Sequence, residues 1–81
     1  MTLVQRNLKR IIDEKALVQK GVARRAGISD QMLSNIVNGR KLIRADMVPR
    51  LARAVDEPIS ELFRGYDEAE GGEKNGSVLQ E

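Results

Sequence analysis

The sequence contains no cysteine, no histidine and no tryptophan, and it has only one phenylalanine and one tyrosine in 81 residues. Without cysteine and histidine it lacks disulfides, thiolate nucleophiles, imidazole bases and nearly every usual ligand set for zinc or haem. We therefore expect no metal and no other cofactor. Because large aromatic side chains are scarce, the core must be built from aliphatic residues, which favours closely packed helices.

Long apolar runs are also missing. No run approaches the roughly 20 residues that a membrane span needs, and the N-terminus has no signal-peptide pattern. We expect a cytoplasmic protein without a membrane partner.

Positive and negative side chains are nearly equal in number over the chain, but they are unevenly distributed. Residues 1–63 hold 12 Lys and Arg against 7 Asp and Glu, and residues 64–81 hold 2 against 5. The first part therefore carries +5 (12 − 7) and the second carries −3 (2 − 5). A basic domain suggests a polyanionic partner, although this value alone is common in other proteins.

Apolar residues recur at helical spacing in successive short segments. Gly27 ends the second segment, Ser29 or Asp30 is a good N-cap for the third, and Asp46 is a candidate cap for the fourth. Beyond Gly65 the chain has too little apolar area to offset the entropy of ordering. The sequence predicts an all-α, compact five-helix domain over residues 1–65 and a disordered acidic tail over residues 66–81.

The most informative stretch is QKGVARRAGISDQMLSNIV, residues 19–37, which reads as two short helices joined by a tight turn. Two helices that cross steeply after so short a turn need a small residue at their contact and a glycine where φ is positive. Ala23 and Gly27 occupy these positions. The apolar residues then point inward, and the second helix presents a polar strip outward.

This stretch resembles the helix-turn-helix of the lambda repressor and Cro superfamily, also called the XRE family. The resemblance rests on the string Gln19, Val22, Ala23, Ala26, Gly27, Ile28 and Ser29, and it continues without a gap to Phe63. It implies a bacterial or phage DNA-binding domain with a helix-turn-helix at about 19–38. One departure is Val18, where the family commonly has Ser or Thr as the N-cap of the second helix, so that helix start is expected to lack its cap.

The resemblance also implies how the residues would contact DNA. The third helix would enter the major groove, and the N-terminus of the second helix would lie at a phosphate. Base-reading residues would be Asp30, Gln31, Ser34 and Asn35, and phosphate contacts would come from Gln19, Asn38, Arg40, Lys41 and Arg44. Because the third helix carries no Arg or Lys, A·T-containing half-sites are weakly favoured.

We expect a transcriptional regulator, a repressor that binds a palindromic operator in double-stranded DNA as a homodimer. Candidate dimer contacts are Leu42, Ile43, Ile59, Leu62 and Phe63. Leu42 and Ile43 are equally well explained as residues that close the core under the loop.

Two alternatives to a transcriptional regulator are a protein-interaction module and an enzyme. An antitoxin-like or other protein-interaction module would use the helix-turn-helix domain together with the tail as the site for a protein partner. An enzyme is rejected, because the carboxylates form no cluster and no nucleophile–base pair or phosphate-binding glycine loop is present.

Overall fold

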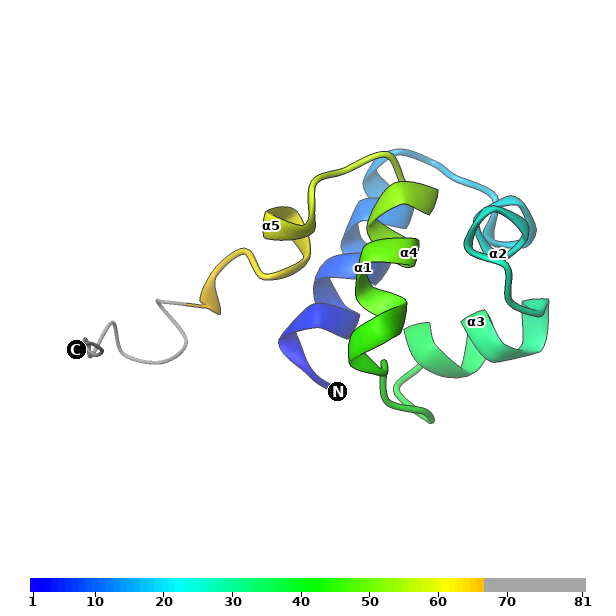
Figure 1. Cartoon of the computed structure of the whole chain (residues 1–81), viewed down its shortest axis with the longest axis horizontal. Coiled ribbons are helices and arrows are strands. Elements are labelled where there is room, and N and C mark those ends of the chain that lie inside the picture. Colours follow the sequence, from blue (N-terminus) through cyan, green and yellow to red (C-terminus); the bar gives the residue numbers. More distant parts are fainter. Residues whose placement is uncertain (67–81) are drawn as a thin grey trace.

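The computed structural model describes residues 1–66, which form five α-helices and one 3₁₀ turn and include no strand (Figure 1). The elements are α1 (Leu3–Glu14), α2 (Gln19–Ala26), α3 (Asp30–Val37), the 3₁₀ turn η1 (Ala45–Met47), α4 (Val48–Ala54) and α5 (Ile59–Leu62). The prediction of an all-α, five-helix domain is confirmed. The predicted tail, residues 66–81, lies outside the described residues except for Tyr66.

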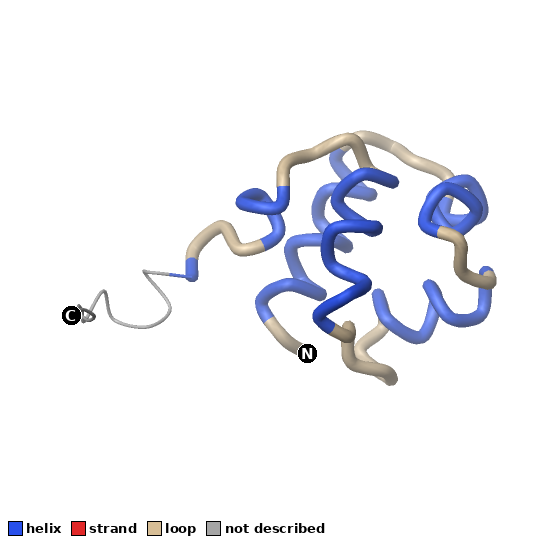
Figure 2. Tube along the Cα trace, in the orientation of Figure 1, coloured by secondary structure: helices blue, strands red, loops and turns tan. Residues whose placement is uncertain are grey.

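The core is aliphatic and receives side chains from all five helices. Helix α2 contacts α3 and α4, α1 contacts α3 and α5, and α4 also contacts α5 (Figure 2). Each helix is therefore supported by at least one helix that is distant in the sequence. Non-directional apolar burial of this kind is the main stabilising term in so small a domain. The buried apolar residues are Leu8, Ile11, Ile12, Val22, Ala23, Ala26, Leu33, Ile36, Val37, Leu51, Ala52, Ala54, Val55 and Leu62.

The start of α1 is fixed by a capping box. The Thr2 hydroxyl accepts a hydrogen bond from the backbone N–H of Gln5 (3.2 Å), and the Gln5 side-chain oxygen accepts one from the backbone N–H of Thr2 (2.8 Å). These bonds satisfy two N–H groups that a helix end otherwise leaves unpaired.

The turn between α2 and α3 has the geometry that the sequence predicts. Gly27 takes a left-handed conformation (φ 75°), and the N–H of Ile28 returns to the carbonyl of Ala23 at 3.0 Å. Ser29 is the N-cap of α3, since its hydroxyl accepts from the N–H of Met32 at 3.0 Å. Figure 1 shows α2 nearly end-on while α3 lies across the view, so the two helices cross steeply.

The start of α4 differs from the prediction. Asp46 lies inside η1 and caps neither η1 nor α4, so its assignment as a cap is wrong. The chain enters α4 through the 3₁₀ turn, in which the Met47 N–H donates to the Arg44 carbonyl at 2.9 Å, and this backbone bond replaces a side-chain cap. Pro49 lies in the first turn of α4, where its missing N–H costs little.

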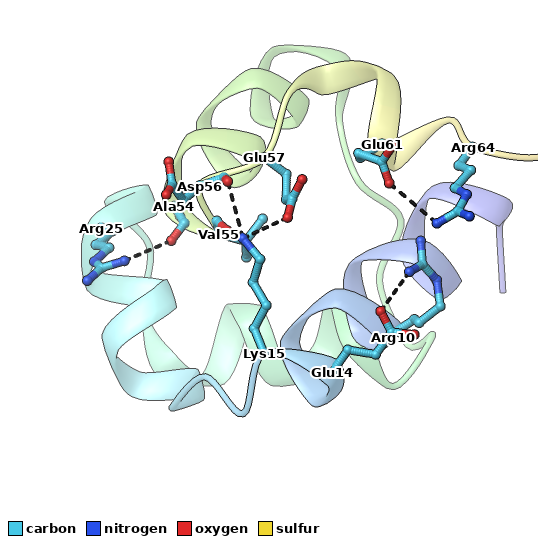
Figure 3. A network of polar contacts seen from close by, with 10 residues as sticks. All are labelled: Arg10, Glu14, Lys15, Arg25, Ala54, Val55, Asp56, Glu57, Glu61 and Arg64. Carbon is cyan, nitrogen blue, oxygen red and sulfur yellow. Dashed lines mark hydrogen bonds and ion pairs between the residues drawn. The ribbon is translucent and has the colours of Figure 1, made fainter.

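The C-terminal end of α4 is closed by two cations, Lys15 directly after α1 and Arg25 of α2 (Figure 3). The Lys15 ammonium donates to the carbonyls of Val55 (2.7 Å) and Asp56 (3.2 Å) and pairs with the Glu57 carboxylate at 2.7 Å. Arg25 donates to the carbonyl of Ala54 at 3.3 Å. Positive charge at a helix C-terminus is favourable, and these bonds satisfy carbonyls that have no partner within the helix.

Candidate nucleic-acid interface

The outward face of α3 is polar and short-chained. Leu33, Ile36 and Val37 are buried, which fixes the rotation of the helix about its axis. The four predicted base-reading residues are therefore left at the surface: Asp30 and Gln31 are exposed, and Ser34 and Asn35 are half-buried.

Hydrogen bonds connect three of these four residues to each other or to residues of the turn after α3. The Gln31 amide nitrogen donates to the Asn35 side-chain oxygen at 3.2 Å. The Asn38 amide nitrogen donates to the carbonyl of Ser34 (2.9 Å) and to its hydroxyl (3.3 Å). The polar face of α3 is thus an ordered array that extends into the turn after the helix.

Arg40 lies against this array. Its Nε donates to the Asn35 side-chain oxygen at 3.0 Å, and a terminal nitrogen lies 3.5 Å from the Ser34 hydroxyl. The sequence grouped Arg40 with Lys41 and Arg44 as loop charges for phosphates. In the free protein its guanidinium instead rests on the side chains of α3.

The other two cations of the basic loop, residues 40–44, are exposed. Lys41 and Arg44 face solvent, and Arg44 reaches only the Asp46 carboxylate at 3.7 Å, with 81% of its side chain exposed. Such an exposed ion pair contributes little to stability, so these cations are free to meet an anion.

The N-terminus of α2 has no side-chain cap, as predicted for Val18. Gln19 and Lys20 are exposed beside it, and no acidic residue lies in the first turn. A helix start with unpaired N–H groups and the positive end of the helix dipole attracts anions.

Asp30, one of the predicted base-reading residues, has a structural role. It lies in the first turn of α3, where a carboxylate interacts favourably with the positive end of the helix dipole. Its position at the exposed start of α3 is compatible with base contact.

Gln5 is a positioning residue that the sequence reasoning missed. Its side chain is fully buried, and its amide nitrogen donates to the carbonyls of Ile36 (3.0 Å) and Lys41 (2.7 Å). Gln5 therefore fastens the end of α3 to the basic loop. The capping box with Thr2 was visible in the sequence, but burial of the amide was not.

The predicted dimer contacts divide into exposed and buried residues. Leu42, Ile59 and Phe63 are 67%, 44% and 41% exposed, and Tyr66, which was not predicted, is 51% exposed. Ile43 is half-buried and packs against the core, in agreement with the alternative that it closes the core. Leu62 is 0% exposed. It packs in the core of its own chain, so its assignment as a dimer contact is corrected.

Within residues 1–66, no three His, Cys, Asp or Glu side chains are grouped so that they could hold a metal ion. No helix in the same part of the chain is long and apolar enough to cross a membrane.

Comparisons with known proteins agree with the arrangement of α2 and α3. The family model described as a helix-turn-helix domain matches residues 6–68. A comparison with curated protein sequences finds no match.

Two solved structures share the fold. The restriction-modification controller protein C.AhdI from Aeromonas hydrophila is similar with a TM-score of 0.69 and 23% identity, over 75% of this chain and 92% of that one. The clp gene regulator ClgR from C. glutamicum is similar with a TM-score of 0.71 and 19% identity, over 96% of this chain and 92% of that one. With the family match over residues 6–68 and the left-handed turn at Gly27 between α2 and α3, this chain belongs to the helix-turn-helix domain family of DNA-binding proteins.

Proposed function

We propose that this protein is a sequence-specific transcriptional regulator, a repressor that binds a palindromic operator in double-stranded DNA as a homodimer. One observation carries the proposal: the outward face of α3 is an ordered polar array that continues directly into the basic loop after it. A face of this kind matches the two parts of a DNA groove, base edges and phosphates.

In this proposal α3 lies in the major groove. Asp30, Gln31, Ser34 and Asn35 face base edges, where amide and carboxylate groups can discriminate base pairs. The N-terminus of α2, with Gln19, lies at a phosphate, because its N–H groups have no side-chain cap. The DNA backbone at the C-terminal end of α3 is contacted by Asn38, Lys41 and Arg44. These contacts set the affinity more than the sequence preference.

The described functions of the two similar structures support a regulatory role. One is a restriction-modification controller and the other is a clp gene regulator. Repression follows most simply, because a dimer bound across a promoter blocks it by occupancy.

A homodimer is proposed because one domain of this size contacts too little DNA to be very selective. Two copies related by a two-fold axis read half-sites about one helical turn, roughly 34 Å, apart. Ile59, Phe63 and Tyr66 follow one another along the C-terminal part of the domain and are all substantially exposed. They are the best candidates for the dimer surface, with Leu42 as a further contact.

The experiment that tests the proposal is selection from a random double-stranded DNA library with the purified full chain. An enriched inverted repeat with half-sites about one turn apart is the expected result. If no sequence is enriched, the proposal fails and the protein-interaction module becomes the better explanation.

A further inference from the structure

We propose that Arg40 is a base-reading residue, and that Arg40 and Asn35 together read a guanine in each half-site. The inference rests on the proposed DNA-binding function and changes the half-site expected from the sequence. Its first support is the contact of the Arg40 guanidinium with the side chains of Asn35 and Ser34 at 3.0 and 3.5 Å.

The contact with Arg40 fixes the orientation of the Asn35 amide. A guanidinium has only donors, so the Asn35 atom that faces it must be the oxygen. The Gln31 group within 3.2 Å of the same oxygen must then be its amide nitrogen. The Asn35 oxygen therefore accepts two hydrogen bonds and points toward its own neighbours.

This orientation changes what Asn35 can offer to a base. An amide oxygen has two lone pairs, and both are occupied here by Gln31 and Arg40. Bidentate binding of adenine needs that oxygen to accept from the adenine N6 amino group. With the oxygen occupied, Asn35 offers only its Nδ2 donors.

Asn35 and Arg40 thus form a surface made only of donors. Guanine is the base that presents two acceptors, N7 and O6, in the major groove. Adenine presents the N7 acceptor next to its N6 amino group. That amino group would face only donors and would have no acceptor for its own N–H. Guanine is the base that matches this pair of residues.

The backbone holds Arg40 in this place. Gly39 takes a left-handed conformation (φ 79°) and reverses the chain, and the Arg40 N–H then donates to the Asn35 carbonyl at 2.8 Å. Gln5 binds the carbonyls of Ile36 and Lys41, one before and one after this turn. The guanidinium is therefore directed back over α3, whereas Arg44, further along the loop, points to solvent.

Gln31 remains able to read adenine. One N–H of its amide is donated to Asn35, which leaves its oxygen and its second N–H free. Those two groups match the N6 and N7 edge of adenine. The expected half-site therefore combines a G·C pair, read by Arg40 and Asn35, with an A·T pair read by Gln31.

The test compares random-library selections and binding titrations of the full chain with those of Arg40→Lys, Asn35→Ala and Arg44→Ala. Lysine keeps the charge but loses the planar fork and the Nε donor. We expect Arg40→Lys to lower the preference for guanine over adenine at one half-site position by roughly 10- to 100-fold, with the salt dependence of binding unchanged. Asn35→Ala should relax the same position.

Arg44→Ala is the matched control from the same loop. It should weaken binding to all sequences and leave the base preference intact, because Arg44 is placed to contact phosphates. Circular dichroism of each variant should show that the helices are retained, because the changes are at surface positions.

The results separate the inference from the proposed function. If the unaltered protein enriches no sequence, both fail. If it enriches an operator but Arg40→Lys changes no base preference, the regulator stands and the role of Arg40 is overturned. The same conclusion follows if the base pair whose preference both Arg40→Lys and Asn35→Ala relax is an A·T pair.

Discussion

At the scale of single residues, Gln5 shows how a polar side chain can be as constrained as a core leucine. Its amide makes three hydrogen bonds, one to the Thr2 N–H and two to the carbonyls of Ile36 and Lys41. Each buried group satisfied in this way avoids a desolvation penalty of about 1–3 kcal/mol. The residue therefore contributes to stability and also sets the position of the basic loop.

Replacement of Gln5 tests this account. Gln5→Leu removes the donor to the Lys41 carbonyl and one of two donors to the Ile36 carbonyl, which keeps the Gly39 N–H at 3.1 Å, and should lower the free energy of unfolding by about 1–3 kcal/mol, measured by urea denaturation. Lys9→Ala on the same helix removes only an exposed ion pair with Asp13 (3.3 Å) and should change little. Equal effects of the two substitutions would contradict the role assigned to Gln5.

Gly21 inside α2 and Gly27 directly after it give an opposed pair of substitutions. Gly27 has φ of 75°, so Gly27→Ala should cost about 1–2 kcal/mol, mainly from backbone strain, since the one close contact is the movable end of the Arg50 side chain. Gly21 lies inside the helix with open space around it, and Gly21→Ala should stabilise by about 0.5–1 kcal/mol. Thermal denaturation should show shifts of opposite sign, and shifts of one sign would refute the argument.

At the scale of elements, α2 begins without a cap although its backbone is ready for one. Val18 has extended geometry (φ −83°, ψ 123°), which suits an N-cap residue. Val18→Ser should therefore raise the free energy of unfolding by about 1 kcal/mol in urea denaturation. Val18→Ala, which cannot cap, is the control, and an equal gain from it would show that the missing hydroxyl is not the reason.

Local chemistry explains which elements could be predicted from the sequence. The turn at Gly27, the cap at Ser29 and the outward face of α3 follow from residue type and helical spacing alone. The burial of Gln5 and Asn7 did not follow, because their partners lie 31 to 57 residues away along the chain. The assignment of Asp46 as a cap is wrong because the 3₁₀ turn that precedes α4, in which Asp46 lies, leaves no recognisable mark in the sequence.

The same limit applies to the candidate site. The residues of α3 could be named from periodicity, whereas the return of Arg40 onto Asn35 depends on the reversal at Gly39 and on the distant Gln5. Leu62 was placed at an interface because apolar residues near a helix end look alike in sequence. Only the packing of α5 on α1 and α4 separates buried Leu62 from exposed Phe63.

At the scale of the whole molecule, the proposed DNA-binding and dimer surfaces use mainly different segments. The first is formed by α3 and the basic loop, and the second by Ile59, Phe63 and Tyr66, with Leu42 of the basic loop as a further contact. Phe63→Glu would place an unpaired charge in a dimer interface and should weaken self-association by roughly tenfold or more. Sedimentation analysis checks this, with Arg53→Glu on α4 as an exposed control. An unchanged dimer would move the interface elsewhere.

The two buried amides of α1 also have a consequence for the dynamics of the domain. Gln5 holds the end of α3, and Asn7 donates to the carbonyls of Leu62 (2.8 Å) and Arg64 (3.0 Å) after α5. Helix α1 thus joins the end of α3 to the segment after α5, and neither of them can detach without breaking buried hydrogen bonds. Hydrogen exchange of the α3 amides should therefore proceed through global unfolding, and α3 should be as slow to open as the core that supports it.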